Sequence, residues 1–162
     1  MKKLSIILFL SCLPFQLIDL NAQSIHDFSL ENLEGEWLSF DELKGEQLTI
    51  IDFWASWCKP CMKAMPAIDQ LHQKYKDKGL NVISINTDGP RSISKVLPIS
   101  STLKLSYPVL SDIDNVVMQD LNITVLPTLL IIDTNGEVVY RHEGWVTGNE
   151  IELENQIKSI LQ

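Results

Sequence analysis

Cysteine is scarce in this chain of 162 residues, which contains three: Cys12, Cys58 and Cys61. Cys12 lies in an apolar N-terminal run, so the rest of the chain holds a single pair. A structural zinc site needs four ligands, and the sequence offers no second cysteine pair and only three widely separated histidines. We therefore expect no metal site, and we consider the cysteine pair for redox chemistry.

Basic residues are also few, with 13 lysines and arginines against 21 aspartates and glutamates and a formal net charge of -8. No extended block of lysine and arginine is present. This composition argues against nucleic acid or an anionic membrane surface as the main partner, so we expect proteins or small thiols instead. The length, with 45% hydrophobic residues, allows one domain with a substantial core.

A hydrophobic run long enough to span a membrane is missing as well. The apolar run at 4–13 covers about ten residues, whereas a membrane-spanning helix needs about 20. It follows two lysines and is succeeded by Ala22, a pattern typical of a signal peptide. We predict a signal peptide over 1–22, a domain over 23–162, and export to the periplasm or cell envelope. A retained anchor and a lipid on Cys12 are the alternatives.

The remaining chain alternates between strand and helix patterns. The apolar run at 47–55, interrupted by Asp52, predicts a strand buried on both faces. Helical periodicity from Pro60 to Gly79 and a strand pattern at 80–86 then predict a parallel crossover, with Pro66 kinking the helix. Further expected elements are a hairpin at 28–40, one broken helix within 88–106, a strand at 107–110, a helix at 114–121, strands at 125–133 and 138–142 joined by an Asn-Gly turn, and an amphipathic helix at 149–161 carrying Ile151, Leu153, Ile157, Ile160 and Leu161.

The pair Cys58 and Cys61 has the spacing of a redox site. A loop this short removes almost no entropy from the unfolded chain, so a disulfide here is a poor structural staple. Cys58 is expected at the start of a helix, where free N–H groups and the helix dipole lower a thiol pKa from about 8.5. We expect Cys58 to be the exposed nucleophile and Cys61 the resolving thiol. Pro60 suits the first helical turn, and Lys59 either favours the thiolate or is merely solvated.

Residues 52–61, DFWASWCKPC, resemble the active-site stretch of the thioredoxin superfamily. Pro66 matches the helix-kinking proline of that superfamily, and residues 125–128 match its cis-proline loop. The hairpin, the extra segment at 88–106 and the signal peptide are similar to its exported TlpA-like and ResA-like branch.

This resemblance implies an α/β thioredoxin fold: a central mixed sheet flanked by helices, with an N-terminal hairpin and an insertion before the cis-proline strand. It implies that Pro127 is cis and faces the cysteines, while Trp57 and Leu126 contact substrate. Lys59 and Pro60 would shape the site. No cofactor is implied beyond the redox-active disulfide itself. Without the resemblance, Pro127 would be an ordinary proline at the start of a strand.

Asp52 is a carboxylate within an apolar strand, which is costly unless it is paired or its pKa rises. A raised pKa would let Asp52 accept the proton of Cys61, and thioredoxins proper carry Asp at the matching position. The alternative is a purely structural carboxylate. Exported relatives often carry Asn at this position and Glu where this chain has Ala64, so the substrate choice of that branch does not transfer directly.

The favoured function is a reductase for disulfides of exported proteins, with apocytochrome c as the substrate that the resemblance suggests. The Lys-Pro pair between the cysteines motivates it, because oxidants and isomerases of the superfamily usually carry His there. A membrane electron donor and a monomeric state are expected. The alternatives are a disulfide oxidase or isomerase, a non-catalytic binding module and a peroxidase.

Overall fold

Residues 24–161, the part of the chain that the computed structural model describes, form a seven-stranded mixed sheet in the order β2-β1-β5-β4-β3-β6-β7. The expected signal peptide lies outside these residues. The central strand β3 pairs in parallel with β4 and antiparallel with β6. The strands are β1 (Ser29–Asn32), β2 (Trp37–Ser39), β3 (Leu48–Trp54), β4 (Leu80–Asn86), β5 (Val109–Ser111), β6 (Thr128–Ile132) and β7 (Val138–Glu143).

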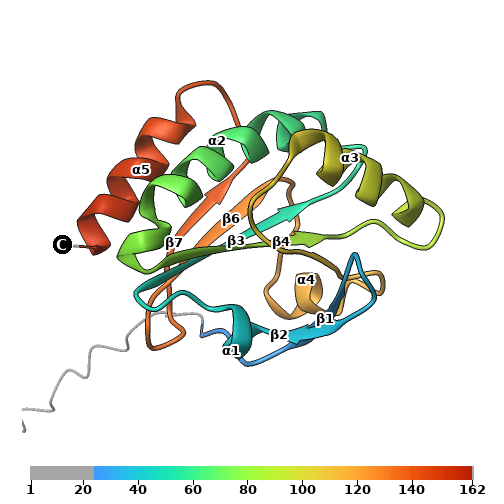
Figure 1. Ribbon diagram of the computed structural model, residues 1–162, viewed down its shortest axis with the longest axis horizontal. Helices are drawn as coiled ribbons and strands as arrows, with labels where there is room; N and C mark the ends of the chain where they lie inside the picture. Colours follow the sequence, from blue (N-terminus) through green and yellow to red (C-terminus); the bar gives the residue numbers. More distant parts are fainter. Residues whose placement is uncertain (1–23, 162) are drawn as a thin grey trace, which may run out of the picture.

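Helices cover both faces of the sheet, as Figure 1 shows. The helices α2, α3 and α5 lie on one face, and α1 and α4 lie on the other. This arrangement confirms the predicted thioredoxin-like architecture of a mixed sheet flanked by helices. The helical segments are α1 (Phe40–Leu43), α2 (Lys59–Tyr75), the 3-10 turn η1 (Lys76–Lys78), the 3-10 turn η2 (Ile93–Lys95), α3 (Val96–Leu103), α4 (Val116–Asp120) and α5 (Asn149–Ile160).

All seven residues of β3 are buried, as its apolar run predicts. Its side chains alternate between the two faces of the sheet. Leu48 and Ile50 pack with residues of α2 and α5, whereas Ile51 and Phe53 pack with residues of α1 and α4. The same alternation places Asp52 on the face that α2 covers.

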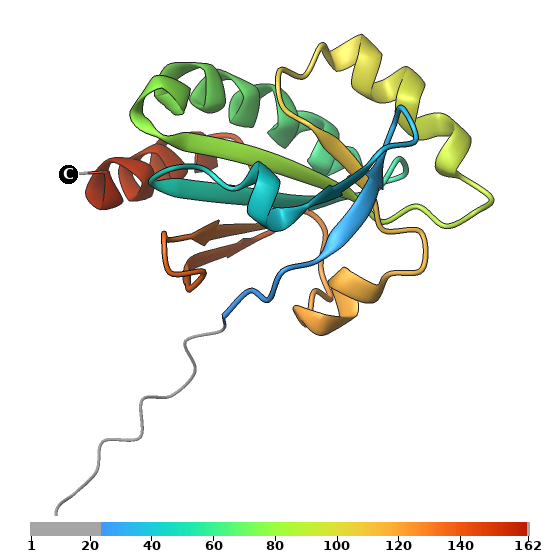
Figure 2. The same ribbon diagram turned by 60° about the horizontal axis from the view of Figure 1, so that its bottom comes forward.

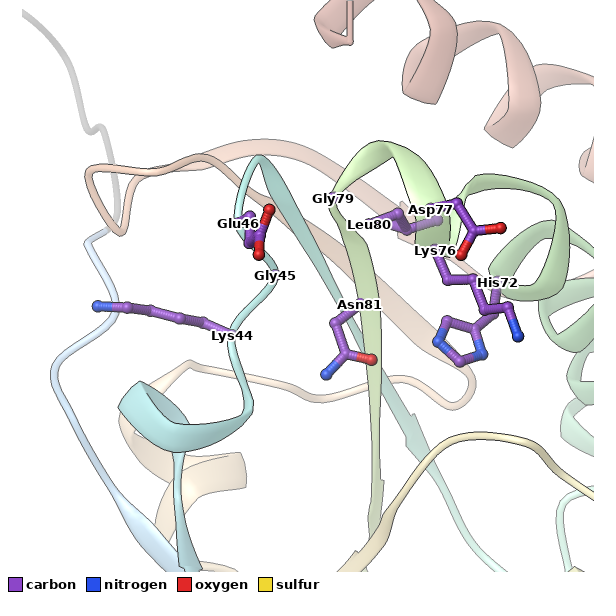
Figure 3. A pocket seen from close by; sticks show the side chains of 9 residues that line it. All are labelled: Lys44, Gly45, Glu46, His72, Lys76, Asp77, Gly79, Leu80 and Asn81. Atoms are coloured by element: carbon purple, nitrogen blue, oxygen red, sulfur yellow. The ribbon is translucent and has the colours of Figure 1, made fainter.

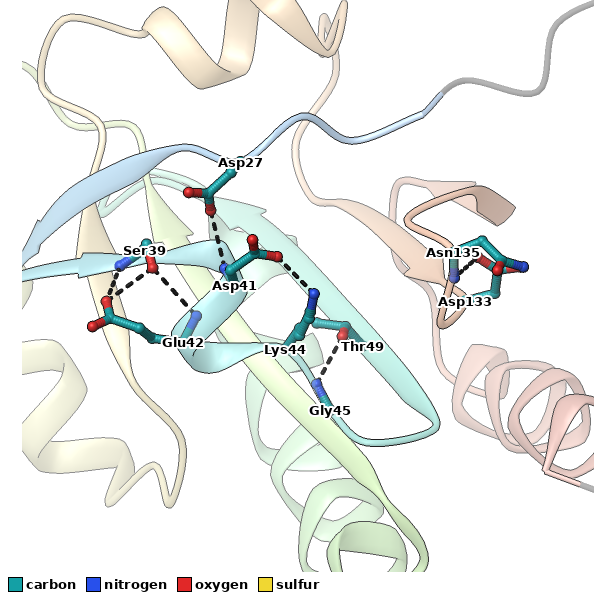
Figure 4. Close-up of polar contacts among 9 residues, drawn as sticks. All are labelled: Asp27, Ser39, Asp41, Glu42, Lys44, Gly45, Thr49, Asp133 and Asn135. Atoms are coloured by element: carbon teal, nitrogen blue, oxygen red, sulfur yellow. Dashed lines mark hydrogen bonds and ion pairs between the residues drawn. The ribbon is translucent and has the colours of Figure 1, made fainter.

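The N-terminal hairpin forms as expected, and it joins the sheet through pairing of β1 with β5. Figure 2 shows this hairpin, in blue, near the front of the domain with α4, in orange. A capping box starts α1: the Ser39 hydroxyl accepts from the Glu42 N–H, and the Glu42 carboxylate accepts from the Ser39 N–H (Figure 4). The hydrogen bond from the Ser39 backbone lowers the pKa of Glu42.

The helix α2 begins where the sequence predicts but ends at Tyr75, and the 3-10 turn η1 covers the rest of the predicted span up to Gly79. Pro60 lies in its first turn, Pro66 lies inside it, and Gly79 adopts the left-handed conformation with φ 88° after η1. The segment 88–106 contains η2 and α3, and Pro98 lies inside α3, so the expectation of one broken helix there holds. This insertion joins β4 to β5, and both β5 and α4 separate it from the cis-proline strand β6.

Some details differ from expectation. Ile151, predicted on the buried face of the last helix, is 63% exposed. Leu153 and Ile157 are the residues of α5 that are buried, and Ile151 lies two positions before Leu153, on another side of the helix. The strand predicted at 107–110 spans 109–111 instead. Within residues 24–161 no helix has the length and apolar character needed to cross a membrane.

Candidate active site

Cys58 is the N-cap residue of α2 and follows Trp54, the last residue of the buried strand β3, after a three-residue loop. Its N–H donates to the Ala55 carbonyl at 3.0 Å, which turns the chain from strand to helix. Its sulfur accepts a hydrogen bond from the Cys61 N–H at 3.2 Å. The first N–H groups of a helix lack partners within it, and here one of them points at Sγ. This geometry stabilises negative charge on the sulfur of Cys58 when the pair is reduced.

The two cysteines form a disulfide, with 2.00 Å between the sulfurs and 5.3 Å between the Cα atoms. We expected Cys58 to be exposed, and in this oxidised form it is not: it is 4% exposed, against 0% for Cys61. The N-cap side chain turns back over the first turn of α2 and packs in one cluster with Trp54 and Met65. Cys58 is nevertheless the more accessible of the two sulfur-bearing residues.

Asp52 is fully buried, and neither of its carboxylate oxygens has a hydrogen-bond partner. Burial without a partner disfavours the charged form, and it raises the pKa of Asp52 from 3.8 to about 7. On β3 it lies two residues before Trp54, whose side chain shares a cluster with both cysteines. Asp52 therefore lies on the cysteine side of the sheet in a form that is half protonated near neutral pH.

The loop before β6 also packs at the cysteines. The Leu126–Pro127 peptide bond is cis, as the resemblance implies. Leu126 is half-buried and packs against the cluster that contains Cys58 and Cys61, while Pro127 is buried. Val125, the preceding residue, is 43% exposed. The structure thus brings the proline loop and the cysteine pair together, although they are far apart in sequence.

The other predicted site residues surround the disulfide on the surface. Trp57 is 70% exposed, and Lys59 and Pro60 are exposed in the first turn of α2. Trp54 lies in the core instead. The role of Lys59, as a charge that favours the thiolate or as a solvated side chain, stays a prediction.

Sequence reasoning missed Asp88, which is 1% exposed and bonds to the loop before Cys58. One oxygen accepts from the Ser56 N–H at 2.6 Å and from the Asn86 side-chain amide at 2.8 Å, and the other accepts from the Ser56 hydroxyl at 2.8 Å. Burial alone would raise the pKa of Asp88, but these hydrogen bonds together lower it. The available signal was its place just after β4, because parallel strands bring their carboxyl ends to one edge of the sheet.

The cavity in Figure 3, about 420 Å³, lies at the opposite ends of β3 and α2 from the cysteines. Its walls come from the segment before β3, the end of α2 with η1, and the start of β4; they comprise Lys44, Gly45, Glu46, His72, Lys76, Asp77, Gly79, Leu80 and Asn81. Neither cysteine is among the residues that line this cavity. In residues 24–161 no three His, Cys, Asp or Glu side chains gather in a way that could hold a metal ion.

A cysteine pair that closes a disulfide at the start of a helix can exchange it with the thiols or disulfides of another molecule. On a mixed sheet of this topology, with a cis-proline loop against the pair, this chemistry defines a thioredoxin-fold thiol-disulfide oxidoreductase. The chain belongs to the AhpC/TSA family, which it matches over residues 22–141.

Curated relatives have names of the same class. The chain is 37% identical over 131 residues to the thioredoxin-like protein YneN of Bacillus subtilis, covering 80% of this chain and 75% of that protein. It is 33% identical over 126 residues to the thiol-disulfide oxidoreductase ResA of Halalkalibacterium halodurans, covering 78% and 70%. These relatives confirm the predicted enzyme class, so the protein is a thiol-disulfide oxidoreductase.

Solved structures confirm the fold. A DsbE-like thiol:disulfide interchange protein of Chlorobium tepidum superposes with a TM-score of 0.79 at 28% identity, covering 87% of this chain and 97% of the other. StoA of Bacillus subtilis superposes with a TM-score of 0.68 at 25% identity, covering 85% and 99%. The predicted mixed sheet flanked by helices is therefore the fold of known relatives.

Proposed function

We propose that this protein reduces disulfides of exported proteins. The observation that carries the exchange chemistry is the position of Cys58, which caps α2 and accepts the Cys61 N–H on its sulfur. The direction follows from Lys59 and Pro60, because no histidine stands between the cysteines to stabilise the thiolate and the reduced form. Apocytochrome c is the substrate that the resemblance to the exported branch suggests.

The reaction starts from the reduced pair. The Cys58 thiolate attacks one sulfur of a substrate disulfide, a mixed disulfide forms, and the other substrate sulfur leaves as a thiolate that takes a proton from water. Cys61 then loses its proton and attacks the Cys58 sulfur. This step releases the second substrate sulfur and closes the Cys58–Cys61 disulfide, so two electrons pass to the substrate.

Asp52 is the proposed acceptor for the Cys61 proton. Its carboxylate has no hydrogen-bond partner to hold it in the charged form, and its pKa of about 7 lies near the pH of the reaction. A base with a pKa far below 7 would take this proton poorly. Asp52 can therefore accept the proton when Cys61 attacks and return it to solvent or substrate in a later step.

The substrate-binding surface in this proposal is the exposed apolar rim of the disulfide. Trp57 and Val125 are both exposed, and they flank the cysteine pair and the proline loop in sequence. Together with the half-buried Leu126, they offer apolar contacts to an unfolded or extended substrate. The backbone next to Pro127 would pair with the substrate chain, as the resemblance implies.

Trapping of a substrate intermediate tests the exchange mechanism. The Cys61→Ser variant should accumulate a mixed disulfide with a peptide that carries an oxidised C-x-x-C-H motif, whereas Cys58→Ser should form none. A matched peptide without the histidine shows whether the protein prefers haem-attachment motifs. If Cys58→Ser keeps full activity, the protein is a binding module rather than an enzyme.

The reduction potential tests the direction. A value near or below about -250 mV, close to that of thioredoxin, is expected for a reductase fed by a membrane electron donor. A value above about -180 mV would contradict the proposal and make the protein an oxidase or isomerase. Export is tested by mass spectrometry of the mature chain, for which cleavage after Ala22 predicts Gln23 as the first residue. The same spectrum reveals a retained or lipid-modified N-terminus.

A further inference from the structure

Asp88 joins two loops at the edge of the sheet where β3 and β4 end. Its own N–H donates to the Asn86 side-chain oxygen at 3.0 Å, and the Asn86 amide donates back to the carboxylate. Ser56, which follows the neighbouring strand β3, donates its backbone N–H and its hydroxyl to the same carboxylate. Ser56 lies two residues before Cys58. A single buried side chain therefore holds the segment that places the nucleophile.

The carboxylate of Asp88 is both buried and charged. None of the ion pairs found in residues 24–161 involves it, so donors without formal charge are what hold it in place. A charge that is buried among neutral donors is screened less than one in solvent. The negative charge of Asp88 thus remains effective over the short distance to the cysteines.

That distance is set by the turn between β3 and α2. The Cys58 N–H bonds to the Ala55 carbonyl, so residues 55–58 form a turn. The Cα atoms of Ala55 and Cys58 lie within about 7 Å of each other in such a turn, and Ser56 stands between them in the chain. The carboxylate of Asp88 touches Ser56 directly, so it lies on the order of 10 Å from the Cys58 sulfur. Other ionisable side chains near the pair are Asp52, which is buried on the cysteine side of the sheet, and the exposed Lys59 and Lys63 of α2. The buried Tyr107 in turn lies near Asp52.

We propose that Asp88 is a positioning residue that also tunes the redox pair, its buried negative charge disfavouring the Cys58 thiolate and so favouring the disulfide over the reduced pair. Reduction of the disulfide takes two electrons and two protons, and the Cys58 thiol then releases one proton to become the thiolate. A nearby negative charge opposes that release and leaves the neutral dithiol unaffected. Asp88 therefore makes the protein a stronger reductant at a pH where the thiolate forms.

The substitution Asp88→Asn tests this proposal with little change of shape. The amide oxygen can accept from the Ser56 N–H and from Asn86, and the amide nitrogen can donate to the Ser56 hydroxyl, whose oxygen also accepts. At a separation of about 10 Å and an effective dielectric constant of about 20, loss of the charge should lower the Cys58 pKa by roughly one unit. The dithiol–disulfide equilibrium at pH 8 should shift up to about tenfold toward the reduced pair.

Two controls separate charge from structure. Asp133→Asn removes an equal charge in the β6–β7 turn, at the end of β6 remote from Pro127, and should leave both quantities unchanged. Ser56→Ala removes the hydroxyl contact and keeps the Asp88 charge, so it should not lower the Cys58 pKa. The pKa is measured from the pH dependence of thiol alkylation, and the equilibrium is measured against a thiol–disulfide buffer at pH 8 and pH 5.

The proposal predicts a difference between Asp88→Asn and the parent at pH 8 that disappears at pH 5, where the thiolate is not populated. An equal difference at both pH values would show a purely structural role and overturn the proposal. If Asp88→Asn shifts the equilibrium no more than the control Asp133→Asn does, the proposal is overturned as well. If Asp88→Asn does not fold, Asp88→Ser is the second neutral variant. The inference rests on Cys58 as the nucleophile; a failure of the reductase proposal would appear in the parent's absolute potential, not in this difference.

Discussion

Asp52→Asn is the substitution whose effect on stability follows most directly from the structure. The carboxyl of Asp52 is fully buried with no partner, which raises its pKa from 3.8 to about 7 in the folded protein. In the unfolded chain the group ionises near its ordinary value. Between these two values the folded state holds one more proton than the unfolded state, so the free energy of unfolding falls as pH rises through this window.

The size of the effect follows from the same two values. A pKa difference of this extent corresponds to roughly 4 kcal/mol, which is fully lost above about pH 7 and fully regained below about pH 4. Asparagine is close in size and has no charge to bury. Its buried amide carries a cost of unsatisfied donors that does not depend on pH. The variant's stability relative to the parent should therefore rise by roughly 4 kcal/mol from pH 4 to pH 8.

Urea unfolding of both proteins at several pH values between 4 and 8.5 measures this difference. Both proteins are kept oxidised, so that the disulfide is intact and cysteine titration does not contribute. A difference in unfolding free energy between variant and parent that stays flat across the range would refute a raised pKa for Asp52. Asp88→Asn is the matched control of opposite sign, because a lowered carboxyl pKa stabilises the protein above the unfolded value and ceases to do so only in acid.

Three further substitutions test the surface and the packing. Trp57→Ala should change the unfolding free energy by less than about 0.5 kcal/mol, because this side chain is 70% exposed. It should raise KM for a protein disulfide but not for a small-molecule disulfide, and an equal rise in KM for both substrates would contradict the docking role. Glu154→Gln should cost up to about 1 kcal/mol at pH 7, because hydrogen bonds, led by that from Lys74, lower the pKa of this partly exposed carboxyl to about 2. Stability from a lowered pKa is lost as pH falls through that value, so the cost should shrink in acid and vanish below about pH 2; a urea titration in which the cost does not shrink would disprove this. Gly45→Ala should destabilise by about 1–3 kcal/mol, because its Cβ would lie 2.6 Å from the Gly79 carbonyl oxygen; an unchanged melting temperature would show that the loop relaxes freely.

The central part of the fold, from β3 through α2 to β4, could be predicted because local hydrophobic patterns in the sequence indicate each of these elements. The apolar run of β3 is typical of a strand buried on both faces, and the helical periodicity that follows predicts a crossover to β4. The order of the strands beyond this unit has no such signal. That β1 enters the sheet next to β5 depends on pairing between segments about 80 residues apart, which neither composition nor periodicity encodes.

The site was predictable to the same extent. Cys58, Cys61 and Asp52 stand in one short stretch, so their spacing and burial pattern follow from the strand and the helix start. The accessibility of Cys58 did not follow, because it depends on how the N-cap side chain folds back over α2. The role of Asp88 could not be predicted for a different reason. Its partner Ser56 lies 32 residues away in the sequence, and a single Asp after a strand most often serves only in a turn or at the surface.

Asp52 and Asp88 together show that burial alone does not decide the charge of a carboxyl group. Both are almost completely buried, at 0% and 1% exposure, yet their pKa values move in opposite directions. The difference lies in the donors, because Asp52 has none and Asp88 receives hydrogen bonds from Ser56 and Asn86. A group that stays charged cannot carry a proton during the exchange, and a group that changes its charge near pH 7 cannot supply a constant field. The proposed division of proton transfer and electrostatic tuning between Asp52 and Asp88 therefore follows from where the sequence supplies hydrogen-bond donors.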